Sequence, residues 1–171
     1  IWLELDNIGK MPPSKEFLTY YRDNLESAMR KETEHFFGHI LKENLPPREF
    51  LAANYSFLNR ELAEHYGMSG LNGNHFRKVS LPNTSRGGIL GHGSFLTASA
   101  NGVDTSPVVR GIYVMNKLLD YTPPPPPDDV PAIEPDVRGA TTLREQLIKH
   151  RADATCAQCH NKIDPVGFAL E

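Results

Sequence analysis

Cys156-Ala157-Gln158-Cys159-His160 is the stretch from which the rest of this chain is best interpreted. Two thiols three positions apart can each add to a vinyl group of haem, and the imidazole of the next residue is then delivered to the iron. This spacing is typical of covalent haem c attachment. It predicts Cys156 and Cys159 as the thioether anchors and His160 as the proximal iron ligand.

A CxxC pair has three other common uses: a zinc site, a structural disulfide and a redox dithiol. The 171-residue chain contains only these two cysteines, so a structural zinc site lacks the second Cys pair that would complete four ligands. A disulfide across so short a loop would be strained or catalytic rather than structural. A redox dithiol remains the open alternative, although it does not require the histidine that follows Cys159.

The composition is that of an ordinary globular protein, with 39% hydrophobic and 23% charged residues. A net charge of −3 provides no basic surface for nucleic acid, and no apolar run reaches the length of a transmembrane segment. The first residues lack both an initiator Met and a signal peptide. Because haem c attachment is normally completed outside the cytoplasm, we expect a periplasmic or otherwise extracytoplasmic protein and an export signal in a missing upstream part.

Local signals around the pentapeptide predict helices and a spacer. Thr142-Leu-Arg-Glu145 is a capping box that opens a helix through His150, and residues 164–168 favour a turn. Residues 121–137 contain a run of five prolines and predict a polyproline II spacer. Upstream of it, residues 104–107 predict the start of a helix that ends near Asp120, with Pro107 in its first turn.

The N-terminal half favours helices as well. An apolar stripe predicts one long helix from Ser14 to about Glu43, and residues 55–66 predict a second. Residues 75–81 favour one short strand. We therefore predict a mostly α fold: a helical haem c domain with an N-terminal long-helix extension and a polyproline spacer. The predicted domains are residues 1–68, the end of a preceding helical domain, and residues 69–171, which carry the haem.

The sixth haem ligand is harder to predict. His92 is the first choice, because it lies between glycines in an apolar segment where a haem plane could approach the backbone; a surface-loop histidine is the common alternative. His150 lies close to Cys156 in sequence and suits a hydrogen bond to a propionate or carbonyl better. Met115 and Met68 are further choices, each more often part of a core.

Several residues fit supporting roles. Arg151 is predicted beside the haem, and with Arg110 and Arg144 it could pair with propionates; ordinary surface charge is the alternative for each. Asp164-Pro165 follows His160 closely, so a carboxylate or carbonyl there could accept the free ring N–H of that histidine.

His35 and His39 are four residues apart on the predicted long helix and could present two imidazoles to a metal. Without a further motif, a solvated helix face is the favoured interpretation for this pair.

The chain resembles a known family in stretches spread over nearly its whole length. These are Arg86-Gly-Gly-Ile-Leu90, Thr105-Ser-Pro-Val-Val-Arg-Gly111, Thr142-Leu-Arg-Glu-Gln-Leu147 and Ile163-Asp-Pro-Val-Gly-Phe-Ala-Leu-Glu171. They are similar to the cytochrome-like domain, of unknown function, of large planctomycete multidomain proteins. Asn54-Tyr-Ser-Phe-Leu-Asn59 and Leu62-Ala-Glu-His-Tyr-Gly67 resemble the helical domain that usually precedes it. Relatives often carry Met where this chain has Ile163, and they continue past Glu171.

The resemblance implies a secreted or periplasmic mono-haem module within a larger protein. Together with the pentapeptide it predicts one covalent haem c and one-electron transfer to a redox partner protein or to other domains of the same polypeptide. A peroxidase-type enzyme with an open sixth iron position is an alternative. Another is a structural or interaction module in which the haem only stabilises a small fold.

Overall fold

The computed structural model describes residues 2–10, 13–82, 86–100, 102–103, 105–125 and 142–170. This part of the chain is mostly helical with one two-stranded sheet, which confirms the predicted fold class. The chain divides into two compact units, Ile1–Thr105 and Ser106–Glu171. This division lies further along the chain than the predicted boundary between residues 68 and 69. The apolar, glycine-containing segment around His92 therefore belongs to the first unit. Each unit is described by itself.

The first unit contains η1 (Leu5–Asn7), α1 (Leu18–Arg22), α2 (Leu25–Lys42), α3 (Glu49–Ala52), β1 (Tyr55–Leu58), α4 (Arg60–His65), β2 (Arg77–Ser80), η3 (Ile89–Gly91) and α5 (Gly93–Ala98). The second contains α6 (Pro107–Leu118), α7 (Leu143–His150) and α8 (Ala154–Phe168). No helix in these ranges is both long and apolar enough to cross a membrane.

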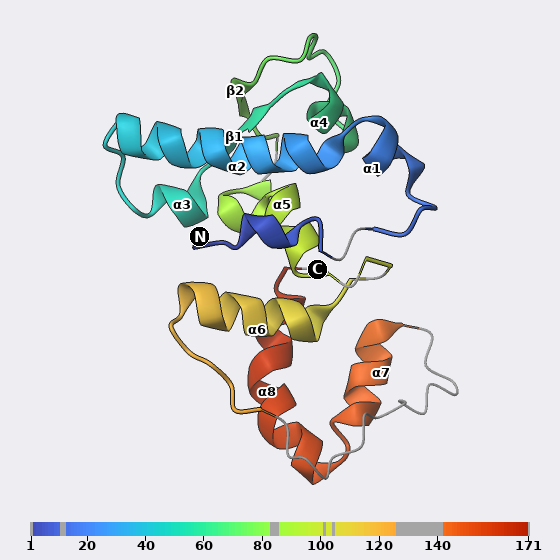
Figure 1. Cartoon of the computed structure of the whole chain (residues 1–171). Coiled ribbons are helices and arrows are strands. Elements are labelled where there is room, and N and C mark those ends of the chain that lie inside the picture. Colours follow the sequence, from blue (N-terminus) through green and yellow to red (C-terminus); the bar gives the residue numbers. More distant parts are fainter. Residues whose placement is uncertain are drawn as a thin grey trace. The chain divides into compact units, whose positions relative to one another are not determined.

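Helix α2 is the centre of the first unit. Its apolar stripe, which includes Leu25, Met29, Phe36 and Ile40, is almost completely buried. The β1–β2 ribbon and α4 lie on one side of α2, and α3 and α5 lie on the other (Figure 1). An isolated two-stranded ribbon is marginal in water, so its packing on α2 supplies the apolar contact it needs.

The predicted single helix from Ser14 to Glu43 is wrong in its first part. The chain forms α1, breaks, and restarts as α2, because Asn24 adopts a left-handed backbone with φ of 51°. Asparagine tolerates this conformation better than most residues. The apolar stripe continues across the break, and for this reason periodicity alone did not reveal it.

The predicted helix over residues 55–66 is also wrong in its first part. Residues 55–58 form β1, which pairs antiparallel with β2 in the register Tyr55↔Ser80. Only α4 is helical, and Asn59 caps it by accepting a hydrogen bond from the Leu62 amide at 3.0 Å. The predicted short strand over residues 75–81 is confirmed as β2.

In the second unit, α6 packs on α8. Pro107 occupies the first turn of α6, as predicted. The two helices approach closely where both carry glycine: a Cβ added at Gly167 would lie 1.8 Å from the Pro107 carbonyl oxygen, and one at Gly111 would lie 2.4 Å from the Ile163 oxygen. The predicted capping box is confirmed at the start of α7, where Thr142 and Glu145 bond each other's amides.

The predicted turn over residues 164–168 is wrong. Helix α8 continues through Pro165 to Phe168, although an interior proline removes one backbone hydrogen bond. Gly167, which makes the close contact with α6, lies in this last part of α8. Residues 121–125 have no regular secondary structure, and the rest of the predicted polyproline spacer lies outside the described residues.

Candidate functional site

The CxxCH pentapeptide lies in the first turns of α8 rather than in a separate turn. Asp153 caps this helix, and its carboxylate accepts hydrogen bonds from the amides of Thr155 at 2.8 Å and Cys156 at 3.3 Å. Asp153 is not among the predicted site residues, although an Asp just before a helix start is an ordinary N-cap signal. Both cysteines are free thiols and half-buried.

The environment of Cys156 favours the neutral thiol. Partial desolvation, followed by the negative charge of Asp153, raises the pKa of the Cys156 thiol. Reactive dithiol motifs depend on the opposite effect, a pKa lowered by free helix N-terminal amides or nearby cations. Because Asp153 already occupies those amides, the open alternative of a redox dithiol loses support.

His160 is oriented by a buried carboxylate one helical turn further on. Its Nδ1 lies 2.9 Å from Oδ1 of Asp164, whose side chain is completely buried. The other oxygen of Asp164 lies 3.5 Å from Nε of Arg151. A carboxylate accepts the Nδ1 proton, which leaves the Nε2 lone pair of His160 for another ligand. Nε2 has no hydrogen bond to the described part of the chain.

This geometry identifies which group occupies the predicted supporting position. The side chain of Asp164 accepts a hydrogen bond from His160, whereas Pro165 is exposed on α8. Continuity of the helix produces the contact, because residues four apart lie on the same face.

His150 is the neighbour of His160 in this unit. The two ring centroids are 4.5 Å apart, with one ring edge-on to the other. Burial lowers the pKa of His150, and the nearby His160 lowers it further. We therefore expect His150 to be largely neutral at pH 7, and its imidazole is available as a hydrogen-bond partner near the pentapeptide.

A cavity of about 390 Å³ opens beside Cys159. It is lined by Met115, Tyr121, Pro123, Pro124, Gln158, Cys159, Lys162 and Ile163. His160 does not line it, since Cys159 and His160 occupy neighbouring faces of α8. Among the four choices for the sixth ligand, Met115 is the one that shares a cavity with a cysteine of the pentapeptide.

The three arginines predicted to pair with propionates each contact another residue of the protein. Arg151 lies beside Asp164, and the Arg144 guanidinium lies 3.9 Å from the ring centroid of Phe168. Arg110 is buried and contacts the Leu170 carbonyl oxygen at 3.4 Å. Arg151 touches the surroundings of His160 through Asp164.

Two family models match the chain. Residues 86–171 match PSCyt3, described as a protein of unknown function (DUF1588), and residues 1–68 match PSD4, also described as a protein of unknown function (DUF1592). The chain belongs to the PSCyt3 family. Both are domains of planctomycete-type multidomain cytochrome-like proteins. No curated protein and no solved structure matches.

His92, the predicted distal ligand, lies in the core of the first unit of this PSCyt3 chain. Its side chain is 1% exposed, its Nδ1 lies 2.9 Å from Oγ1 of Thr33, and its ring meets the ring of Phe36 edge-on. His160 belongs to the second unit, so the structure does not test a joint role of these two histidines. These contacts account for His92 without a ligand role, and its role as a haem ligand stays a prediction. Met68 packs against the core cluster of the same first unit.

The burial of His92 predicts a pH dependence of stability. Burial lowers the pKa of His92, whereas the unfolded chain takes up this proton near pH 6.5. The stability contributed by neutral His92 is thus present above about pH 6.5 and is lost as the pH falls below it, by up to about 1.4 kcal/mol per pH unit. Urea unfolding followed by fluorescence of Trp2, the single tryptophan, reports on this unit.

His92→Asn should flatten this slope relative to the native chain. The exposed His75 provides a matched control, because His75→Asn should leave the slope unchanged. Equal slopes for the native chain and His92→Asn would contradict the assignment.

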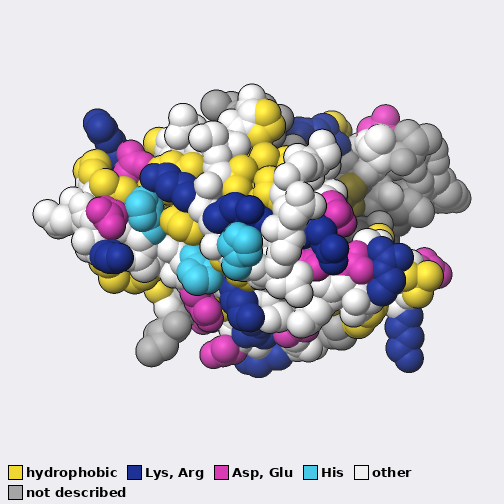
Figure 2. All heavy atoms as spheres, turned by 90° about the horizontal axis from the view of Figure 1, so that it is seen from above, with side chains coloured by type: hydrophobic (Ala, Val, Ile, Leu, Met, Phe, Trp, Pro, Cys, Tyr) yellow, Lys and Arg dark blue, Asp and Glu magenta, His cyan; other side chains and the backbone are white. Residues whose placement is uncertain are grey.

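His35 and His39 belong to an aromatic and basic cluster on the surface of the first unit. His35 stacks on Phe76 with centroids 5.1 Å apart, and Nε2 of His39 lies 3.0 Å from Nζ of Lys78. Figure 2 shows histidine and basic side chains close together on this face. No group of three metal-binding side chains occurs among the described residues.

Proposed function

We propose that the second unit carries one haem c, attached through Cys156 and Cys159, with His160 as an axial ligand. The observation that carries this proposal is the buried Asp164 carboxylate, which holds Nδ1 of His160 and leaves Nε2 as the free donor. The donor set fits the cofactor in type and order: two free thiols three residues apart, then an imidazole. When bound, such a haem supplies one-electron redox chemistry.

The residues around His160 would tune this chemistry. A carboxylate that accepts the Nδ1 proton makes the imidazole a stronger electron donor. A stronger donor stabilises the more highly charged, oxidised iron, so Asp164 lowers the reduction potential. Arg151 places a positive charge beside this carboxylate, with its Nε 3.5 Å from the second oxygen of Asp164.

For the second axial position we propose Met115 ahead of His92. Met115 is buried in the same unit as the pentapeptide and lines the cavity beside Cys159. A thioether in that position is a common partner of histidine in electron-transfer haems. The unit would then exchange electrons with a redox partner protein or with other domains of a larger extracytoplasmic polypeptide.

The test is haem attachment to the full chain, exported together with a haem c maturation system. We expect one covalent haem per chain in the pyridine haemochrome assay. The double variant Cys156→Ala/Cys159→Ala should carry none while keeping its helical circular dichroism, since neither cysteine is fully buried.

A folded, exported native chain without covalent haem would overturn the proposal. The spectrum of the loaded protein separates electron transfer from the peroxidase alternative: a six-coordinate, low-spin iron in both oxidation states excludes an open position. Met115→Ala should convert that iron to a five-coordinate or water-bound form, whereas His92→Asn should not.

A further inference from the structure

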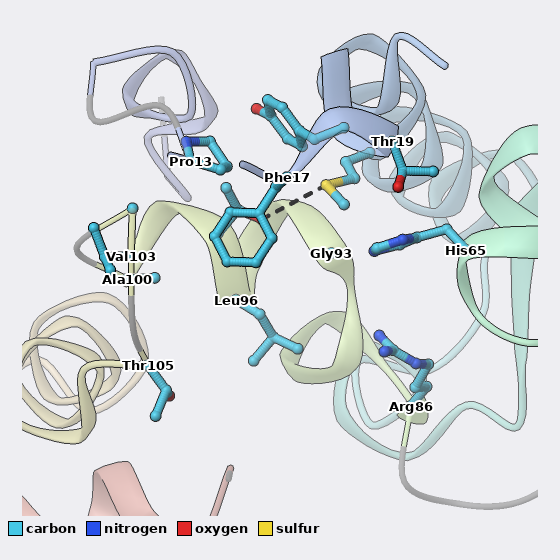
Figure 3. A pocket seen from close by; sticks show the side chains of 14 residues that line it. Pro13, Phe17, Thr19, His65, Arg86, Gly93, Leu96, Ala100, Val103 and Thr105 are labelled. Carbon is cyan, nitrogen blue, oxygen red and sulfur yellow. Dashed lines mark hydrogen bonds between the residues drawn. The ribbon is translucent and has the colours of Figure 1, made fainter. Parts of the chain in front are cut away.

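The first unit contains a pocket of about 310 Å³ that the haem proposal does not use. Its walls are mainly apolar and include Phe17, Tyr20, Met29, Leu96 and Val103. Phe17 and Val103 are 49% and 64% exposed, so apolar surface continues to the rim. In Figure 3, Arg86 and His65 lie on one side of this pocket, and Pro13, Ala100 and Val103 lie on the other.

Arg86 is the only arginine or lysine among the side chains that line this pocket. Its guanidinium lies 4.1 Å from the ring centroid of Tyr66, and its Nη1 donates to the Gly91 carbonyl oxygen at 3.3 Å. No carboxylate in the described ranges forms an ion pair with it. A half-buried guanidinium fixed by stacking and one hydrogen bond still presents donors for a planar anion.

Tyr66, whose ring stacks against Arg86, is held in place by hydrogen bonds to buried groups. The Tyr66 hydroxyl donates to Oε2 of Glu32 at 2.6 Å and accepts from the Gly93 amide at 2.8 Å. The other oxygen of Glu32 accepts from Ser56 at 2.6 Å. The buried carboxylate of this unit is thus bonded by two hydroxyls, and its hydrogen bonds position Tyr66 rather than bind Arg86.

Among the described residues, the remaining polar side chains that line the pocket carry no negative charge. Thr97 donates to Sδ of Met29 at 3.6 Å, and Thr19 lies at the exposed edge. Partial burial, and then the positive charge of Arg86, lower the pKa of His65. His65 is therefore largely neutral at pH 7, and the pocket offers one fixed positive charge beside apolar walls.

We infer that this pocket binds a small amphipathic monoanion, a carboxylate on a short hydrocarbon chain, with the carboxylate on Arg86. The volume is at the small end of ligand-binding pockets, and apolar walls with few fixed polar groups are typical of them. The hydrocarbon would lie against Phe17, Leu96 and Val103. This inference does not rest on the proposed haem.

The test is isothermal titration of the full chain with decanoate, decanol and decylamine. We expect decanoate to bind at least tenfold more tightly than decanol, since a charge-assisted hydrogen bond contributes about 1.5–3 kcal/mol. Decylamine should bind most weakly, because its ammonium group would face Arg86. This comparison needs no variant, so it tests the inference even if a substitution unfolds the protein.

Arg86→Gln should remove the preference for decanoate over decanol, while Arg60→Gln should keep it. Arg60 is exposed on α4, pairs with Glu61 at 2.8 Å and does not line this pocket. Leu96→Trp, which fills the pocket, should abolish binding of both ligands. Decanoate binding no tighter than decanol, or unchanged in Arg86→Gln, would overturn the inference, as would no binding by the native chain.

Discussion

Gly167→Ala should lower the free energy of unfolding of the second unit by about 3 kcal/mol, the upper part of the usual range for overpacking. An alanine Cβ would lie 1.8 Å from the Pro107 carbonyl oxygen and 2.5 Å from its carbon. Both are backbone atoms of α6, so no side-chain rotation relieves the clash and the two helices must separate. This cost exceeds the gain of about 1 kcal/mol that alanine normally brings to a helix interior.

The measurement is urea unfolding of the full chain followed by two signals. Trp2 lies in the first unit, so its fluorescence transition should stay in place while part of the circular dichroism transition moves to lower urea. Gly38→Ala is the matched control, because a Cβ at Gly38 in α2 meets nothing within 4 Å. That variant should be neutral or more stable by up to about 1 kcal/mol. Equal unfolding curves for Gly167→Ala and the native chain would contradict the close α6–α8 contact.

Asp164→Asn should raise the reduction potential of the haem-loaded protein by about 60 mV or more. Asparagine still accepts a hydrogen bond from His160 but carries no charge, so the imidazole becomes a weaker donor to oxidised iron. Loss of such an outer partner typically changes metal affinity 10–100-fold, and a tenfold change between oxidation states is about 59 mV for one electron. Arg151 also loses its partner, and we expect a stability loss of about 1–3 kcal/mol.

Asp153→Asn is the control for the effect of Asp164. It makes the same chemical change on the same helix, and asparagine keeps the N-cap that Asp153 provides. Redox titration of both haem-loaded variants should show a clear shift for Asp164→Asn and a small one for Asp153→Asn. Equal shifts would indicate a general charge effect and remove the specific role of the His160–Asp164 contact.

Two of the confirmed predictions concern patterns that act within one turn of chain. The capping box at Thr142 and the proline in the first turn at Pro107 both work through hydrogen bonds and dihedral angles of adjacent residues. One incorrect prediction concerns a segment whose structure depends on a distant partner. Residues 55–58 become a strand because β2 pairs with them, and their own pattern also suits a helix.

His92 and His160 show that the sequence around a histidine does not reveal whether its side chain is buried. His92 and His160 are both flanked by residues that suit a haem, yet His92 is enclosed by Thr33 and Phe36 in the core. Nothing local distinguishes a core histidine from a ligand, because burial depends on which distant helices cover it. The pocket around Arg86 was missed for this reason, since its walls come from segments spread between residues 13 and 105.

The sequence by itself determined the donor set of the proposed haem site: two thiols, an imidazole and their order along five residues of chain. It also placed a carboxylate four residues after His160. The structure decided that Asp164 is the partner of that histidine, because a continuous helix from His160 to Asp164 turns both side chains to one face and the carboxylate is buried beside Arg151. The spacing of the two cysteines and the histidine is fixed by their order in the sequence, whereas the burial and charge pairing of Asp164 depend on how the helices pack.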